Sequence, residues 1–206
     1  MSKLAIIVLA AALQLSSQFQ PARVVSSTFG GFPYGSVAAG LVVLDVDVDQ
    51  GGAVRGINTL KDLEPFGDVV RRSVSAWRFE PAREGGQAVE HPTLVAVLVR
   101  PAAVMFTAPP PPPGPPPGVT RSIPIPTGIG IPAYPPNRIG SAAVLVEVEI
   151  DFQGTVTSAQ IKGEQTGFDD TSLEAARRWT FRPARHKNID VASRAYLLFV
   201  FRQPAT

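Results

Sequence analysis

The stretch Trp77-Arg78-Phe79-Glu80-Pro81-Ala82-Arg83 recurs 102 residues later as Trp179-Thr180-Phe181-Arg182-Pro183-Ala184-Arg185. The same offset, without a gap, matches Pro33 with Pro135, Val42 with Val144, Asp49 with Asp151, Gly52 with Gly154, Phe66 with Phe168 and Arg100 with Arg202. Chance does not place so many tryptophans, prolines and glycines in one register. The sequence therefore indicates a duplicated unit of about 70 residues.

Each copy begins with two strands. From Val144 to Ile150 apolar residues alternate with polar ones, the pattern of a strand with one buried face, and residues 42–48 repeat it. Gln153-Gly154 predicts a tight hairpin into a second strand from Val156 to about Lys162. The acidic rows on the other face are Asp45, Asp47 and Asp49, and Glu147, Glu149 and Asp151. We expect a solvated face, paired with Arg55 or Lys162, rather than a Ca²⁺ site or an acid/base pair, because neighbouring sites on one face splay apart.

A helix and a third strand follow. Thr171 and Glu174 match a capping box, and apolar residues recur at helical spacing up to Trp179, which we expect in the core. Unbroken apolar runs at residues 94–99 and 196–201 predict the third strands. The sequence thus predicts an α+β fold of two tandem small domains, residues 24–104 and 132–203. Each is a three-stranded antiparallel sheet with one helix packed on it, in the order strand-strand-helix-strand.

Two other segments differ in composition. Thirteen of the 21 prolines lie between Ala108 and Pro136, so residues 105–131 are expected to form a polyproline II linker between the domains. Lys3 followed by the apolar run Leu4–Leu13 predicts a secretory signal peptide over residues 1–20. The run is about half the roughly 20 residues that a membrane-spanning helix needs. Its alternatives are a buried element of the first domain, or an uncleaved segment that holds the protein in the inner membrane.

The second copy resembles the C-terminal domain of TonB, the periplasmic energy transducer of Gram-negative bacteria. The resemblance rests on Tyr134-Pro135, Gly140, Asp151-Phe152-Gln153-Gly154-Thr155-Val156, Phe168-Asp169, and Arg177 to Ala184. The first copy is similar but has Phe32-Pro33 in place of Tyr-Pro and Gly67 in place of Asp169. The resemblance implies a periplasmic protein-binding module with a role in envelope transport. The Pro-rich stretch lies between the copies, unlike in full transducers, where it follows a membrane anchor.

The resemblance also implies a binding site. In the family the third strand lies at the sheet edge and takes up an extended peptide, the TonB box of outer-membrane transporters, by β-strand addition. Carried onto this chain, the partner-binding residues are Tyr134, Pro135, Arg138, Ala195, Tyr196, Leu197, Leu198, Phe199, Val200, Phe201 and Arg202. Since both faces of this strand are apolar, we expect Tyr196, Phe199 or Phe201 to need a covering partner. The alternative is a structural protein in which the two copies cover each other, or a homodimer forms, through the same strands.

Other classes of function are excluded or disfavoured. The chain has no cysteine, and its two histidines, His91 and His186, are too few and too isolated for a metal cluster. Mixed charges without a Lys/Arg run disfavour nucleic acid. No nucleophile–base pair or glycine-rich phosphate loop is present. We therefore expect no enzyme, no cofactor, no metal and no small-molecule substrate, and Arg83 and Arg185 either bind a carboxylate or form structural ion pairs.

Overall fold

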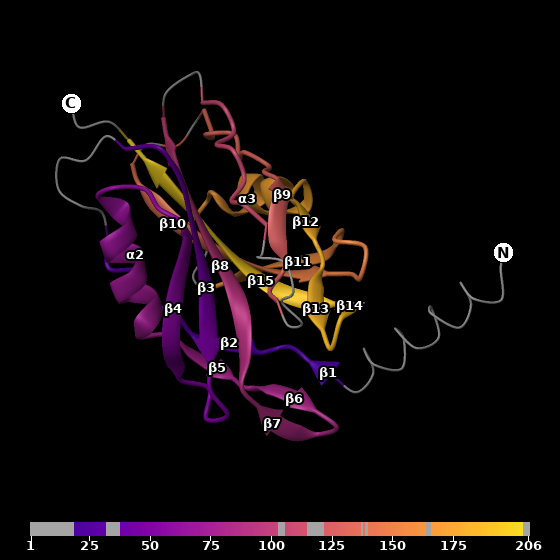
Figure 1. Ribbon diagram of the computed structural model, residues 1–206. Coiled ribbons are helices and arrows are strands. Elements are labelled where there is room, and N and C mark those ends of the chain that lie inside the picture. The colour runs from indigo at the N-terminus through magenta and orange to yellow at the C-terminus, as the bar shows by residue number, and fades with distance from the viewer. Residues whose placement is uncertain are drawn as a thin grey trace, which may run out of the picture.

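The computed structural model describes residues 19–31, 38–102, 106–114, 122–136, 138, 140–163 and 166–203 (Figure 1). The first half contains β1 (Phe19–Gln20), β2 (Arg23–Ser26), β3 (Gly40–Val48), β4 (Val54–Lys61), α2 (Phe66–Ser75), β5 (Arg78–Glu80), β6 (Ala82–Glu84), β7 (Gln87–Val89) and β8 (His91–Pro101). The second half contains β9 (Ile125–Gly128), β10 (Ala142–Ile150), β11 (Val156–Lys162), α3 (Asp169–Arg177), β12 (Thr180–Arg182), β13 (Ala184–His186), β14 (Ile189–Val191) and β15 (Ser193–Arg202).

The long strands of both halves form one six-stranded sheet in the order β11-β10-β15-β8-β3-β4. Within each half the order is second strand, first strand, third strand, as predicted, and the pairing is antiparallel. The third strands β15 and β8 lie side by side at the centre and are parallel. The α+β class is therefore confirmed, whereas the prediction of two separate three-stranded sheets is wrong.

The register of the seam between β15 and β8 is shifted by one residue from the repeat. Ala195 pairs with Leu94, although the residue equivalent to Leu94 in the repeat is Tyr196. Paired residues on neighbouring strands point to the same face, and successive residues point to opposite faces. A shift of one residue therefore turns equivalent positions toward opposite faces of the sheet. As a result α2 and α3 cover opposite faces (Figure 1).

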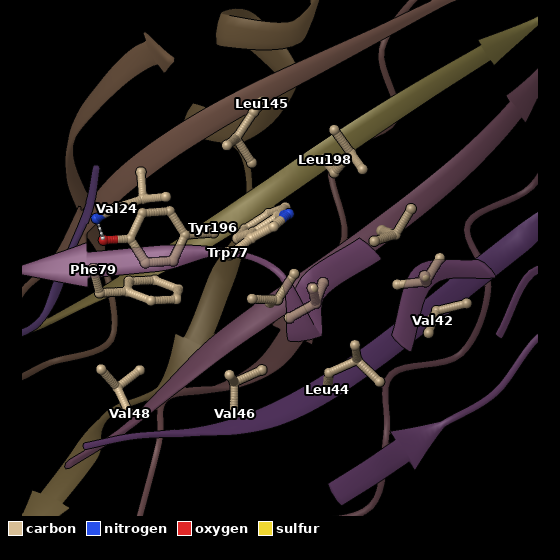
Figure 2. Close-up of a cluster of buried hydrophobic side chains, with 14 of the residues drawn as sticks. Val24, Val42, Leu44, Val46, Val48, Trp77, Phe79, Leu145, Tyr196 and Leu198 are labelled. Atoms are coloured by element: carbon tan, nitrogen blue, oxygen red, sulfur yellow. Dashed lines mark hydrogen bonds between the residues drawn. The ribbon is translucent and has the colours of Figure 1, made fainter. Parts of the chain in front are cut away.

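Both cores are built from both halves. The first core, beneath α2, joins the first-half residues Val42, Leu44 and Trp77 to Tyr196 and Leu198 of the second half (Figure 2). The second core, beneath α3, joins second-half residues to Leu41, Val43, Leu94, Ala96 and Leu98 of the first half. Trp77 and Trp179 are both buried, as predicted. Because each core contains side chains of both halves, the halves pack together as one folded unit.

A strap precedes the first long strand in each half. The first strap (residues 19–30) pairs through β1 with β6 and through β2 with β5. The second strap (residues 122–131) makes the equivalent contacts, by a bridge from Ser122 to Arg185 and by pairing of β9 with β12. The predicted linker is therefore wrong over residues 122–131, which belong to the fold.

The boundary that the sequence predicted at residue 20 also needs correction. Phe19 and Gln20 lie in the first strap, and Phe19 is buried, so the folded part includes residues assigned to the signal peptide. Residues 1–18, which carry the predicted apolar run, lie outside the described part.

Two smaller predictions also differ from the structure. The capping box is absent: the N-cap of α3 is Phe168, and Thr171 donates its hydroxyl hydrogen bond to the carbonyl oxygen of Ala133. Part of the Pro-rich stretch packs against the protein, because Pro112 is buried and Phe106 contacts the second core. The described part of this stretch is thus not a free spacer.

Candidate partner-binding site

The predicted strand Ala195–Arg202 lies within β15, in the middle of the sheet. On one side its residues pair with β10, and on the other side they pair with residues 94–101 of β8. The prediction that the third strand is an edge is therefore wrong in this structure. The backbone groups that the resemblance assigns to a peptide are already used by the chain's own first half.

The side chains of β15 divide between the two cores. Tyr196, Leu198 and Val200 lie in the first core, whereas Leu197, Phe199 and Phe201 lie in the second core with α3. The sequence grouped Tyr196 with Phe199 and Phe201, but alternation along a strand places it on the opposite face. The first half covers this strand, so within this structure the two copies cover each other.

Tyr196 anchors the first strap to the sheet. Its hydroxyl oxygen accepts a hydrogen bond from the backbone N–H of Val24 at 2.8 Å (Figure 2). Its proton is shared between the carbonyl oxygen of Ala22, at 3.0 Å, and Oε2 of Glu147, at 3.3 Å. Burial, with the nearby carboxylate of Glu147, raises the pKa of Tyr196 well above its usual value. The phenol therefore acts as a neutral donor and acceptor that joins the halves.

Glu147 is the one acidic residue of its row that is buried, with 5% of its surface exposed. Its Oε1 lies 3.2 Å from Nζ of Lys162 and 3.9 Å from Nε of Arg23 in the first strap. The expected pairing with Lys162 is confirmed, and so is the pairing of Asp49 with Arg55. The prediction of a fully solvated acidic face is wrong at Glu147, because the first strap covers it.

The other predicted residues line a cleft at the end of the paired strands. This end cleft, of about 520 Å³, is bounded mainly by Arg100, Tyr134, Pro135, Pro136, Arg138 and Gln203. Tyr134 donates its hydroxyl hydrogen bond to the carbonyl oxygen of Gly140 at 2.5 Å, and Oε1 of Gln203 accepts from the N–H of Gly140 at 2.6 Å. These bonds fix the walls, so the cleft is preformed.

Two arginines give the end cleft its charge. Arg100 is buried, its Nε donates to the carbonyl oxygen of Pro132 at 3.1 Å, and burial lowers its pKa. Arg138 is exposed at the rim of the end cleft. It also lines a second, neighbouring hollow together with Asp169 and Asp170. Arg202 instead turns to the first half, where its guanidinium lies 5.7 Å from the ring centre of Phe66.

Sequence reasoning missed Arg100 and Gln203, although a signal for one of them was present. Arg100 is the repeat equivalent of Arg202, which the resemblance had already singled out. An anionic group in the end cleft would meet Arg100 next to proline and tyrosine walls, while the guanidinium of Arg138 lies at the rim against Gly167. This arrangement suits an acidic, extended segment of another chain.

The two histidines meet at the other end of the seam. The rings of His91 and His186 are 6.0 Å apart, and Phe19 contacts both of them. Nε2 of His186 lies 3.4 Å from Oε1 of Glu84, which Nζ of Lys187 contacts at 2.5 Å. The histidines are thus close in space, contrary to the expectation of isolation. Within the described residues, no group of three or more acidic or histidine side chains could hold a metal ion.

The remaining candidates have structural surroundings. Arg185 lies 3.4 Å from Asp190, and Arg83 donates to the carbonyl oxygen of Gly86 at 2.9 Å. Oδ2 of Asp169 accepts from the N–H groups of Thr166 and Gly167, before the helix begins. In the described part of the chain, no helix is long and apolar enough to cross a bilayer.

Comparison with known proteins found one family model that matches the second half. Residues 137–202 match the family model for the C-terminal domain of the Gram-negative bacterial TonB protein. The family is an envelope-associated, non-enzymatic protein-interaction domain whose members interact with proteins such as outer-membrane transporters. The comparisons with curated proteins and with solved structures each found no match.

Proposed function

We propose that this chain is a periplasmic protein-interaction module of the TonB type that binds an acidic, extended segment of an envelope protein in the end cleft. The observation that carries the proposal is the composition of that cleft. It joins Arg100 of the first half to Tyr134, Arg138 and Gln203 of the second. The paired state of the two halves is therefore the binding-competent state.

The alternative site, along β15, has a high cost in this structure. A peptide there must displace β8, and this exposes Tyr196, Leu198 and Val200, which lie in the first core. Exposing each large apolar side chain costs about 1.5–3 kcal/mol, so these three cost about 5–9 kcal/mol. That is comparable with the whole stability of a small protein, about 5–15 kcal/mol. The end cleft needs no such opening.

One observation nevertheless favours a second candidate. Residues 195–202 pair in unbroken register with residues 94–101, so the outer side of β15 readily takes up an extended strand. If the halves separate, the TonB box of an outer-membrane transporter could occupy Ala195–Arg202 in place of β8. In a third reading the pairing is only structural, and no peptide binds at either place.

A peptide-binding experiment distinguishes binding in the end cleft from a purely structural pairing of the halves. A fluorescein-labelled peptide of alternating Glu and Val residues is titrated with the full chain, and binding is followed by fluorescence anisotropy. Arg138→Glu should weaken binding by about tenfold or more, because it reverses the exposed charge at the rim. Arg177→Glu, an equal charge change at the exposed end of α3, is the matched control and should have little effect. Equal binding by both variants would refute the end cleft.

A disulfide bond between the third strands distinguishes binding in the end cleft from peptide binding along β15. Leu198 and Val97 are paired across the seam, and the native chain has no cysteine. Paired residues on neighbouring strands lie about 4.8 Å apart, within the range that a disulfide spans. The variant Val97→Cys/Leu198→Cys, checked for oxidation by mass spectrometry, cannot release β8. Unchanged peptide binding supports the end cleft, whereas binding that returns only after reduction supports exchange at β15.

A further inference from the structure

Several residues that meet across the seam are equivalent in the repeat but differ in chemistry. Glu84 and His186 occupy the same repeat position, and they face each other at 3.4 Å. Lys187, which also contacts Glu84, replaces a glycine, Gly85, of the first half. A pair of identical halves would bring like residues together here. The tandem pair instead brings an acid against two bases.

The Tyr196 network shows the same asymmetry. The residue equivalent to Tyr196 is Leu94, and the residue equivalent to Val24 is Pro126. Proline has no N–H, so the second strap cannot donate the hydrogen bond that Val24 gives to Tyr196. The network can therefore form only between the strap of the first half and the third strand of the second half.

The charges around Glu147 follow the same division. Arg23 of the first strap lies 3.9 Å from Glu147, and its equivalent in the second strap is Ile125, a residue of the second core. Lys162, the other partner of Glu147, is matched by Leu60 in the first half, which packs against the second core. On the other face the equivalent of Glu147 is Asp45, and the two positions that supply cations to Glu147 are there occupied by the apolar residues Ile125 and Leu60.

We infer that the third-strand edge of the second half is selective for the first half of this chain and rejects a second copy of itself. In a pair of second halves, His186 and Lys187 would face their own kind, without Glu84. Tyr196 would face Pro126 and lose its donor, and Glu147 would face Ile125 in place of Arg23. Unpaired buried polar groups and like charges are the means by which interfaces reject wrong partners.

A cleaved chain tests this inference directly. A protease site is inserted after the exposed residue Ala108, and the folded chain is cut, unfolded in urea and refolded by dilution. Native mass spectrometry then counts the pairs. First–second pairs should exceed second–second pairs by more than about tenfold. A statistical mixture of pairs, or failure of the first–second pair to form again, would overturn the inference.

A variant of the cleaved chain tests the cause. Pro126→Val restores an N–H at the position equivalent to Val24 and should raise the share of second–second pairs several-fold. Pro124→Ala is the matched control: its equivalent, Ala22, contributes only a carbonyl oxygen to Tyr196, so no missing donor is restored. Equal shares in the two variants would remove the hydrogen-bond argument.

The uncut chain gives a separate readout. Glu84→Lys places a cation against Lys187 and His186 and should lower the urea midpoint of unfolding. Glu64→Lys, an equal change at an exposed residue before α2, should lower it less. If both variants lower the midpoint equally, charge complementarity at the seam does not contribute to the selectivity.

Discussion

The indole N–H of Trp179 donates a hydrogen bond of 2.9 Å to the carbonyl oxygen of Gly130. The equivalent bond in the first half, 2.8 Å long, joins Trp77 to the carbonyl oxygen of Thr28. In both halves the tryptophan that ends the helical region therefore holds the strap in place. Each strap in turn contributes to the packing over the other half's third strand, so these two bonds help to keep the halves together.

Removal of the Tyr196 hydroxyl should destabilise the protein. The variant Tyr196→Phe leaves the N–H of Val24 buried without this acceptor, which costs about 1–3 kcal/mol. Urea unfolding at neutral pH measures the loss. Tyr134→Phe is the control, because it removes a hydroxyl of a partly buried tyrosine at the end cleft. A loss at Tyr196 no larger than at Tyr134 would contradict the anchoring role.

The same hydroxyl should make stability fall in alkali. Burial raises the pKa of Tyr196 above the usual value near 10, so the unfolded chain loses this proton first as the pH rises. The contribution is complete below about pH 10, and above it stability should fall by up to about 1.4 kcal/mol per pH unit. The stability difference between wild type and Tyr196→Phe should therefore shrink from pH 10 upward. Parallel pH profiles for the two proteins would contradict this.

The ion pair beneath the first strap should show strong coupling. Lys162→Leu leaves Glu147 buried with Arg23, 3.9 Å away, as its ionic partner, and should cost about 2–3 kcal/mol, since removing one partner of a buried pair is costly. The double variant Glu147→Leu/Lys162→Leu removes both charges and should recover most of that loss. Urea unfolding of the two single variants and the double variant gives the coupling energy. Additive losses would show that the pair is not coupled.

The hairpin glycine Gly154 should not tolerate a side chain. Its φ is +86°, and a Cβ atom there would lie 1.8 Å from the carbonyl oxygen of Phe181. Gly163 also has a positive φ, +103°, but a Cβ atom there meets nothing within 4 Å. Gly163→Ala should cost about 1–2 kcal/mol from backbone strain alone. Gly154→Ala should cost clearly more, and equal thermal shifts in the two variants would contradict the close contact.

Local patterns were sufficient to predict the elements of the second half. Alternation from Val144 to Ile150 located β10, and Gln153-Gly154 located the hairpin. The apolar run at residues 196–201 located β15 and indicated that something covers both of its faces. These signals are short-range, and they hold because the local preferences agree with the final fold.

The relation between the halves could not be read in the same way. Nothing in a strand's own sequence states which strand lies beside it, so the pairing of β15 with β8 and its one-residue shift were missed. The second strap was missed because Pro124, Pro126 and Pro132 resemble linker residues. Short pairings with β12, together with burial of Ile123 and Ile125, override that composition. The partners of Glu147 come from three different segments, so its burial also had no local signal.

The parallel course of the third strands sets a minimum length for the connection between the halves. The chain leaves β8 at Pro101, which pairs with Arg202 at the end of β15, and begins the second strap at Ser122, which bridges to Arg185 shortly before β15 begins. It must therefore travel back along the strands, about 30 Å at 3.3 Å per residue for some nine residues. A fully extended chain spans at most about 3.3–3.6 Å per residue, so a connection of fewer than about nine residues could not reach from one point to the other. The arrangement of the two halves thus sets a lower limit on the length of the connection, whatever its composition.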